Sequence, residues 1–354
     1  MQVLHTESSN GWGGQEIRIL REAIGMRDRG HEIIFAIVKG GKLAQKAREA
    51  GFVVYELDFR RRSALFTIAR LHAIIRRHNI HLVNTHSSLD AWLGGIAARL
   101  AGRHVLRTRH LSTPIRPGLN SRLLYKTLAD GVATTSSAII PMITAQAGIP
   151  SQRCRCIPTG VEPITVAPEE AAAFRESIGV RQDQILVGTA CVVRSWKGIR
   201  DLMRAAEILK DDTRLKWVVV GGGYLDQYQG SPFVTFTGHL DNPFPAIAAM
   251  DVFMLLSTGH EGISQATLQA SWLKKPLITT TVGGLPEVCI DKETGFLVPP
   301  ASPGKVAEAV LKLASDKALR ESLGKNARKH VEDHFLFTHT LNEMELLWSE
   351  VTSN

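Results

Sequence analysis

The feature that most constrains the fold of this chain is a repeated order of apolar run, glycine-bearing turn and helix. The clearest copy has an apolar run at residues 251–256, the turn GHEGISQ at residues 259–265 and a helical pattern at residues 266–273. Such a turn directs several backbone N–H groups and the positive end of a helix dipole at one anion. A phosphate site and an ordinary strand-to-helix connection are equally consistent with this segment alone.

The same order recurs along the second half of the chain. In an open parallel sheet, all turns of this kind leave from the carboxyl ends of the strands, so we expect their residues to converge on one crevice. The further copies are the run 187–193 with RSWKG and a helix at 199–209, the run 217–220 with GGG at 221–223, and the run 277–281 with VGGLPE at 282–287.

The first half alternates between strand-like and helix-like segments, which predicts an α/β fold with a parallel sheet and helices on both of its faces. The segment IPTGVEP at residues 157–163 interrupts this rhythm with two prolines and a glycine, as an interdomain linker does. Strands are expected at 3–5, 31–38, 81–85, 104–107 and 131–135, and helices at 15–29, 67–77, 93–100 and 119–128. The segment 48–57 is expected to hold the end of a short helix followed by a further strand.

Length and composition fit two globular domains. A chain of 354 residues with 44% hydrophobic and 21% charged residues has enough apolar material for two cores. No apolar run approaches the roughly 20 residues of a membrane span, and the start MQVLHTESSN lacks the features of a signal peptide, so we expect a cytoplasmic protein. The four cysteines show no zinc-site spacing and are expected to be reduced: Cys154, Cys156, Cys191 and Cys289.

The net charge of +8 is distributed unevenly. Residues 1–160 hold 23 Lys and Arg against 10 Asp and Glu, whereas the remainder holds 19 against 24. Basic clusters such as residues 60–62 and 76–77 could contact nucleic acid, an anionic membrane or a phosphorylated acceptor. Each cluster alone is better explained as a solvated face, whereas the whole set, concentrated in one half of the chain, indicates a polyanionic partner. Nucleic acid is disfavoured, because only 6% of residues are aromatic and no binding module is recognisable.

Four segments together resemble the retaining GT-B glycosyltransferases of family 4, which use nucleotide-diphosphate sugars. They are VVRSWKG with Arg194 and Lys197, HEGISQATLQ with Glu261, VGGLPEV at 282–288 and TGFLVPP at 294–300. The resemblance implies two Rossmann-like domains whose parallel sheets face each other across a cleft. Residues 1–163 would form the acceptor-side domain, residues 164–334 the donor-binding domain, and a helix in residues 335–354 would cross back to the first domain.

In this resemblance, Arg194 and Lys197 hold the diphosphate of the donor. A guanidinium binds two phosphate oxygens at once and an ammonium acts as a point charge. Cations at the start of a helix oppose its dipole unless an anion binds there, although plain surface solvation is the alternative. Backbone N–H groups of residues 262–264 (Gly262, Ile263 and Ser264), and those of Gly13 and Gly14 from the other domain, would complete the phosphate site.

Glu261 matches the residue with which the family contacts donor-sugar hydroxyls, so its loss should reduce turnover as well as binding. The family's second glutamate, which holds the ribose, is replaced here by Gln269. A neutral amide gives up a charge-assisted hydrogen bond worth about 1–2 kcal/mol more than a neutral one. The remaining expected donor-binding residues are Gly222, Gln265 and His239, the last near the nucleotide base.

His110 ends a strand and matches the family's active-site histidine. Its neutral form could orient a sugar hydroxyl and its protonated form could offset diphosphate charge, whereas a purely structural role is the alternative. His86 follows the strand 81–85 and could line the acceptor side or simply pack, and His5 is equally undecided.

The resemblance predicts a metal-independent transferase of the retaining hexosyltransferase type, without a covalent intermediate, metal or cofactor. UDP is the expected nucleotide of the donor, with GDP or ADP as alternatives. The expected acceptor is a lipid-linked or phosphorylated glycan of lipopolysaccharide or another envelope polysaccharide, reached from the cytoplasmic face of the inner membrane by the basic first domain. The alternatives are a transferase acting on a soluble small molecule and a non-catalytic nucleotide-sugar or glycan-binding protein. A nicotinamide dehydrogenase is disfavoured, because the first turn lacks G-x-G-x-x-G.

Overall fold

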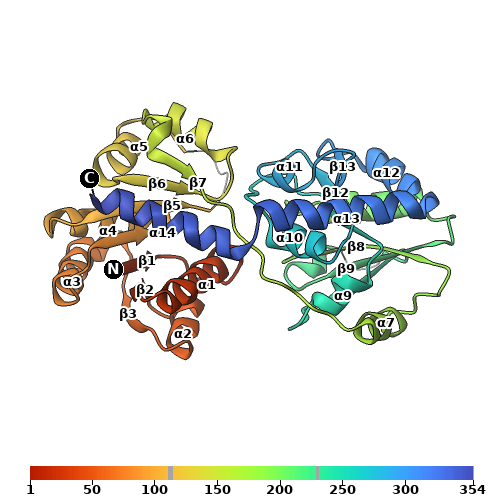
Figure 1. Cartoon of the computed structure of the whole chain (residues 1–354), viewed down its shortest axis with the longest axis horizontal. Helices are drawn as coiled ribbons and strands as arrows, with labels where there is room; N and C mark the ends of the chain where they lie inside the picture. Colours follow the sequence, from red (N-terminus) through yellow and green to blue (C-terminus); the bar gives the residue numbers. More distant parts are fainter. Residues whose placement is uncertain (111–114, 229–230, 354) are drawn as a thin grey trace. The chain divides into compact units, whose positions relative to one another are not determined.

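The computed structural model describes residues 1–110, 115–228 and 231–353. These residues form two compact units, one made of Met1–Pro158 with Thr338–Asn354 and the other of Thr159–Phe337 (Figure 1). Below they are called unit 1 and unit 2. The sequence placed the boundary at 163/164, five residues beyond the division in the structure. Among the described helices, none combines the length and the apolar character required to cross a bilayer.

Unit 1 contains a seven-stranded, entirely parallel sheet in the order β3-β2-β1-β4-β5-β6-β7. The order reverses between β1 and β4, which is where an open sheet of this type leaves a crevice at the carboxyl ends of its strands. The strands are β1 (Gln2–Glu7), β2 (Glu32–Val38), β3 (Val53–Leu57), β4 (Leu82–Thr85), β5 (His104–Arg109), β6 (Gly131–Thr134) and β7 (Cys154–Cys156).

Helices cover this sheet, and the last helix of the chain packs among them. Trp348 of α14 is fully buried, and Glu345 lies 2.8 Å from the guanidinium of Arg29. The final helix, expected within residues 335–354, therefore belongs to unit 1 in the structure. The helices of unit 1 are α1 (Gly14–Asp28), α2 (Lys42–Glu49), α3 (Ala64–Arg77), α4 (Ser88–Leu100), α5 (Leu119–Arg122), α6 (Ile139–Ala147) and α14 (Phe337–Ser353).

Unit 2 contains a six-stranded parallel sheet in the order β10-β9-β8-β11-β12-β13, with its reversal between β8 and β11. The strands are β8 (Ile185–Ala190), β9 (Leu215–Val220), β10 (Val234–Gly238), β11 (Val252–Leu255), β12 (Leu277–Thr280) and β13 (Gly295–Val298). The helices are α7 (Pro168–Ser177), α8 (Ile199–Ile208), α9 (Phe244–Ala249), α10 (Gln265–Trp272), α11 (Leu285–Val288), α12 (Pro303–Ser315) and α13 (Lys317–His334).

Alternate strand residues of unit 2 enter two separate apolar clusters. Leu186 and Phe253 belong to one cluster, whereas their neighbours Val187 and Val252 belong to the other. Because side chains alternate across a strand, the two clusters lie on opposite faces of the sheet, and each is covered by helices. This explains why the strands read as continuous apolar runs in the sequence.

The structure differs from the sequence-based expectation most clearly in the second half of unit 1. The segment 119–128, predicted as one helix, is a short α-helix followed by a π-helical stretch, Leu123–Leu128. Helix α6 and strand β7 were not predicted at all. Strand β7 has only three residues, too few to show the alternation on which strand prediction depends.

Candidate functional site

Two turns of unit 2 contact each other at the carboxyl edge of its sheet. They follow the neighbouring strands β8 and β11, and they carry Lys197 and Glu261. Gly198 has a φ of +70°, and a side chain there would place Cβ only 1.9 Å from the carbonyl oxygen of Leu256. Only glycine combines this conformation with such a close approach, so the RSWKG turn is held directly against the end of β11.

The turn after β12 joins the same edge. Gly283 has a φ of +57°, and a Cβ there would lie 2.0 Å from the carbonyl oxygen of Glu261. Gly284 would place its Cβ within 2.9 Å of Gly262. The convergence that the sequence predicted for the loops of the second domain is therefore present within unit 2.

The central contact of this edge is a buried ion pair. Nζ of Lys197 lies 2.5 Å from Oε1 of Glu261, and the hydroxyl of Ser257 donates to the same oxygen at 2.6 Å. The side chain of Glu261 is 7% exposed and that of Lys197 is 17% exposed. The carboxylate is thus fixed in position by two donors, and Oε2 is left for a further donor.

Arg194 lies beside an aromatic side chain. Its guanidinium carbon is 5.4 Å from the centre of the Trp196 ring, and the ring of His260 meets Trp196 edge-on at 5.6 Å. The carbonyl of Trp196 accepts a hydrogen bond from the N–H of Thr258 at 2.8 Å, which joins this turn to the loop after β11. Arg194 makes no ion pair with any carboxylate of the described residues, so its charge is available to an anion.

Backbone donors lie at the start of α10. Within the part of the chain that the structure describes, the N–H groups of Gly262, Ile263 and Ser264 donate no hydrogen bond to protein acceptors. Ser264 precedes the helix, and its side chain does not cap it. Orphan N–H groups together with the helix dipole favour an anion at this position.

The two glutamines of α10 have different surroundings. The side-chain amide of Gln265 donates to Oγ1 of Thr159 at 2.8 Å and to the carbonyl of Gly160 at 2.7 Å, so it holds the start of unit 2. Gln269, one turn further on, is half-buried and makes no side-chain hydrogen bond within the described residues. Of the two, Gln269 is the one free to contact a ligand.

Gly222 and His239 lie together at the ends of β9 and β10. A Cβ on Gly222 would be 3.2 Å from Cβ of His239. The His239 side chain is 77% exposed, and its Nε2 lies 3.4 Å from Oδ1 of Asp241. The structure therefore gives His239 an exposed position and no role in the core.

Gly13 and Gly14 begin α1 at the reversal of the other sheet, in unit 1. The N–H of Gly13 donates to Oε2 of Glu16 at 2.9 Å, while Gly14 is exposed. A phosphate at Gly13 would have to displace the Glu16 carboxylate.

A buried carboxylate at this reversal was not expected from the sequence. Glu7, at the end of β1, is 1% exposed and accepts from the N–H of Ser9 at 2.7 Å, from Gln15 at 2.5 Å and from the hydroxyl of Ser87. Burial, together with the charge of Asp90, raises the pKa of Glu7 to about 7. The signal available for it in the sequence was an acidic residue two positions after the expected first strand at 3–5.

Three histidines form a buried chain across β1, β4 and β5. Nδ1 of His5 lies 2.8 Å from Nε2 of His86, and Nδ1 of His86 lies 3.0 Å from Nε2 of His110. Burial lowers the pKa of His5 to about 3, and burial with nearby positive charge lowers those of His86 and His110 well below the usual value. All three are neutral at pH 7, which favours the neutral form of His110 over the protonated one.

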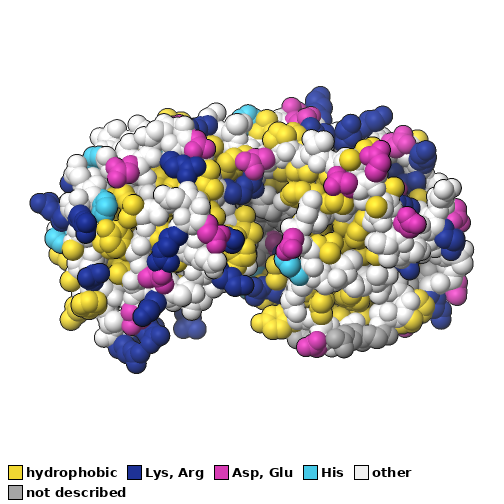
Figure 2. Space-filling model, turned by 90° about the horizontal axis from the view of Figure 1, so that it is seen from below, with side chains coloured by type: hydrophobic (Ala, Val, Ile, Leu, Met, Phe, Trp, Pro, Cys, Tyr) yellow, Lys and Arg dark blue, Asp and Glu magenta, His cyan; other side chains and the backbone are white. Residues whose placement is uncertain are grey.

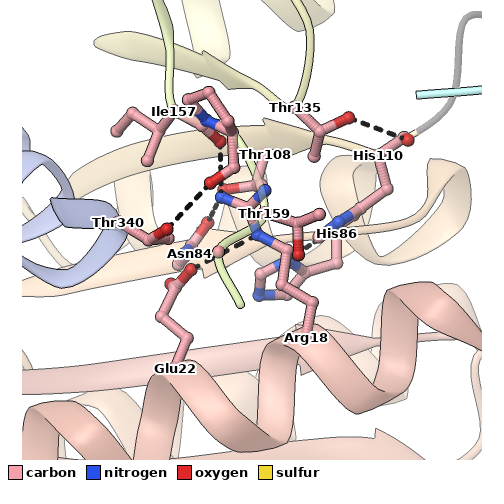
Figure 3. Close-up of polar contacts among 12 residues, drawn as sticks. Arg18, Glu22, Asn84, His86, Thr108, His110, Thr135, Ile157, Thr159 and Thr340 are labelled. Atoms are coloured by element: carbon pink, nitrogen blue, oxygen red, sulfur yellow. Dashed lines mark hydrogen bonds and ion pairs between the residues drawn. The ribbon is translucent and has the colours of Figure 1, made fainter. Parts of the chain in front are cut away.

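Buried charge lies close to these rings (Figure 3). Arg18 of α1 pairs with Glu22 at 3.6 Å and donates to the carbonyl of Ile157 at 2.8 Å. The charge of Arg18 is among the causes that lower the pKa values of His86 and His110. The hydroxyl of Thr135 donates to the carbonyl of His110 at 3.0 Å and fixes the backbone at the end of β5.

Unit 1 also has an open groove between α3 and α4. It begins at Ser88, directly after Ser87 at the reversal of the sheet. Its lining is mostly apolar, with one cation, and consists of Arg61, Ala64, Ser88, Leu89, Trp92 and Leu93.

Comparison with known proteins gives consistent matches. The family model described as Glycosyltransferase Family 4 matches residues 12–185, and that described as Glycosyl transferases group 1 matches residues 182–316. The capsular polysaccharide biosynthesis glycosyltransferase CapM of Staphylococcus aureus is 30% identical over 48% of this chain and 46% of its own length, so the chain spans about half of that relative. The N-acetyl-alpha-D-glucosaminyl L-malate synthase of Bacillus anthracis is 22% identical over 92% of this chain and 91% of its own.

A solved structure has the same fold over the full length. The crystal structure of Anabaena HepE in complex with UDP has a TM-score of 0.87 and 19% identity, covering 99% of this chain and 100% of that one. HepE is also described in complex with UDP-glucose.

Proposed function

Because the chain belongs to the family 4 glycosyltransferases of group 1 and has their GT-B fold, we propose that it transfers a sugar from a nucleotide-diphosphate sugar to a glycan acceptor. The donor would bind at the carboxyl edge of unit 2. The anomeric configuration would be retained, and no metal or cofactor would be required. These finer features rest on the site residues and on similarity to the relatives.

The observation that carries the proposal is the set of positive groups at the reversal of the unit 2 sheet. Arg194, without a carboxylate partner in the described residues, and the free N–H groups at the start of α10 suit a diphosphate. A departing nucleoside diphosphate gains negative charge, so fixed positive groups stabilise the transition state more than the ground state. Lys197 would share its ammonium between the phosphate and Glu261.

Glu261 would bind the sugar and would not act as a nucleophile. Its Oε1 already accepts from Lys197 and Ser257, which leaves Oε2 to accept from sugar hydroxyls. The deprotonation of the acceptor hydroxyl would be assisted by the leaving phosphate. Activity that survives EDTA, with a product of unchanged anomeric configuration, would support retaining, metal-independent transfer; strict dependence on Mg²⁺ or Mn²⁺ would contradict the metal independence.

UDP is the nucleotide that we propose, with GDP and ADP as alternatives. HepE is described with UDP and with UDP-glucose, and Gln269, free at the position expected for ribose binding, can accept from a hydroxyl. A transfer assay with a panel of UDP-, GDP- and ADP-sugars tests this point directly.

For the acceptor we propose a lipid-linked or phosphorylated envelope glycan, as in lipopolysaccharide synthesis, bound by a basic unit 1 at the cytoplasmic face of the inner membrane. CapM, a relative, is named for capsular polysaccharide biosynthesis. Leu65 and Phe66 are 85% and 69% exposed and follow the arginines at 60–62 after two intervening residues. Lys and Arg side chains also stand out beside hydrophobic ones on the face of this unit drawn in Figure 2.

The membrane part of the proposal is tested by co-sedimentation with anionic phospholipid vesicles. Binding should weaken with added salt, because exposed charges are screened, and Phe66→Ser should reduce it. Leu100→Ser is the matched control, since Leu100 of unit 1 is 68% exposed at the opposite end of α4 from Ser88, which lies with Arg61. Equal binding of both variants, or none at low salt, would count against the membrane.

A soluble acceptor is a second candidate, favoured by one observation. One relative that matches nearly the whole chain is named N-acetyl-alpha-D-glucosaminyl L-malate synthase. A small hydroxy acid would then replace the glycan, and transfer would proceed at full rate without vesicles. Donor binding with neither transfer nor donor hydrolysis would instead indicate a non-catalytic binding protein.

A further inference from the structure

The chain of three buried histidines ends at a residue of the expected active site. We infer that His5 and His86 are positioning residues that keep the proton of His110 on Nδ1, so that His110 offers its substrate an N–H donor. The geometry of the three histidines carries the inference about the tautomer, and only the role of His110 toward a substrate rests on the proposed function.

Each neutral imidazole carries one proton, so the two hydrogen bonds of the chain have only two arrangements. In the first, Nδ1–H of His5 donates to His86 and Nδ1–H of His86 donates to Nε2 of His110. In the second, both bonds are reversed and Nε2–H of His110 donates. His86 has one proton for its two bonds, so it couples the tautomer of His110 to that of His5.

His5, at the end of the row of histidines farthest from His110, distinguishes the two arrangements. Nε2 of His5 is buried and has no hydrogen-bond partner among the described residues. In the first arrangement this nitrogen has a lone pair, and in the second it has an unpaired N–H. A buried N–H without an acceptor leaves the cost of its desolvation uncompensated.

A neighbouring ring favours the lone pair. The indole of Trp348 lies edge-on to His5, with 6.0 Å between the ring centroids, and its Nε1–H is likewise buried without a partner in the described part of the chain. An indole N–H is always a donor. A lone pair on Nε2 of His5 avoids burying a second unpaired donor near this one, so the first arrangement is the stable one.

The consequence at the other end concerns the reacting groups. Because Nε2 of His110 accepts from His86, the proton of His110 is on Nδ1. Nδ1 therefore has no lone pair with which to accept a proton from the substrate. A neutral N–H at the end of β5 donates to an oxygen, such as a sugar hydroxyl or a phosphate oxygen. His110 therefore orients an oxygen and does not act as a general base.

The tautomer of His110 is measurable in the full chain without any substrate. Long-range ¹H–¹⁵N correlation spectra of protein labelled at histidine separate protonated from unprotonated ring nitrogens, and His110→Gln identifies the His110 signals. We expect Nδ1 protonated and Nε2 unprotonated at pH 7.5. A protonated Nε2 would overturn the inference whether or not the protein proves to be a transferase.

Two variants test whether the hydrogen bonds among the three histidines set the tautomer of His110. His86→Phe removes both hydrogen bonds while keeping a ring, and we expect Nε2–H of His110 to appear; His5→Phe should act in the same direction and serves if the first variant does not fold. His339→Phe is the control, because His339 is exposed on α14 of the same unit. An unchanged His110 signal in both folded variants would show that the chain does not position it.

Kinetics separate positioning from mere structural support. We expect His86→Phe to lower kcat/KM for transfer about tenfold, equivalent to about 1.4 kcal/mol. In a His110→Gln background, the same change should cost less than about twofold, because residues acting through one another are not additive. A full tenfold loss in that background would contradict positioning through His110.

Discussion

Removing the ammonium of Lys197 should destabilise unit 2, and neutralising its partner Glu261 as well should restore part of the lost stability. Lys197→Met would leave the carboxylate of Glu261, 7% exposed, with the Ser257 hydroxyl as its remaining donor from this contact. Leaving one partner of a buried pair uncompensated costs about 3–5 kcal/mol. Because Lys197 is itself 17% exposed and water reaches the pair, we expect a loss at or slightly below the lower end of this range, about 2–3 kcal/mol.

The assay is thermal unfolding of the full chain, followed by circular dichroism. For a unit of this size about 1 kcal/mol corresponds to about 2–4 °C, so Tm of the unit 2 transition should fall by roughly 5–10 °C. In Lys197→Met/Glu261→Gln the neutral amide no longer needs a cation, and we expect at least about 1.5 kcal/mol to be recovered. If the losses of the two single variants simply added in the double variant, the pair would not be the coupled contact described above.

Three further outcomes are expected. Burial keeps His5 neutral in the folded state, whereas in the unfolded chain this histidine takes up a proton below about pH 6.5. Its contribution to the free energy of unfolding is therefore complete above that pH and declines as the pH falls toward 3. In urea unfolding, the free energy of unfolding of the wild type should fall between pH 7.5 and pH 5.5 by about 1.4 kcal/mol more than that of His5→Phe. Gly198→Ala, with its Cβ against Leu256, should cost about 3 kcal/mol or more, whereas Gly40→Ala, at φ +76° with nothing within 4 Å, should cost about 1. Gln269→Glu should tighten UDP binding about tenfold by calorimetry, and unchanged affinity would remove Gln269 from the ribose site.

The arrangement of unit 2 could be predicted from its sequence because its signals are local. Each buried parallel strand is a continuous apolar run, and the turn that follows contains glycine. Gly198 and Gly283 have positive φ where two loops approach closely, so the residue type itself records the contact. Parallel topology then brings the turns to one edge, which is why Lys197 and Glu261 could be placed together before their 2.5 Å contact was known.

The part of unit 1 that escaped prediction depends on contacts distant in sequence. His5 lies on β1, and His86 and His110 directly follow β4 and β5, three strands that become neighbours only in the folded sheet, so nothing local to any of these histidines indicates the other two. The raised pKa of Glu7 likewise arises from burial and from Asp90, 83 positions away. Periodicity identifies strands, but it does not report which polar side chains share a crevice.

The central claim is that the carboxyl edge of unit 2 binds a nucleoside diphosphate, and calorimetric titration of the unliganded protein with UDP tests it most directly. We predict one site per chain, and at least about tenfold weaker binding by Arg194→Ala with unchanged Tm, whereas Arg200→Ala on the exposed side of α8 binds as the wild type does. Equal affinity of the Arg194 and Arg200 variants, or no heat with UDP, GDP or ADP, would contradict it.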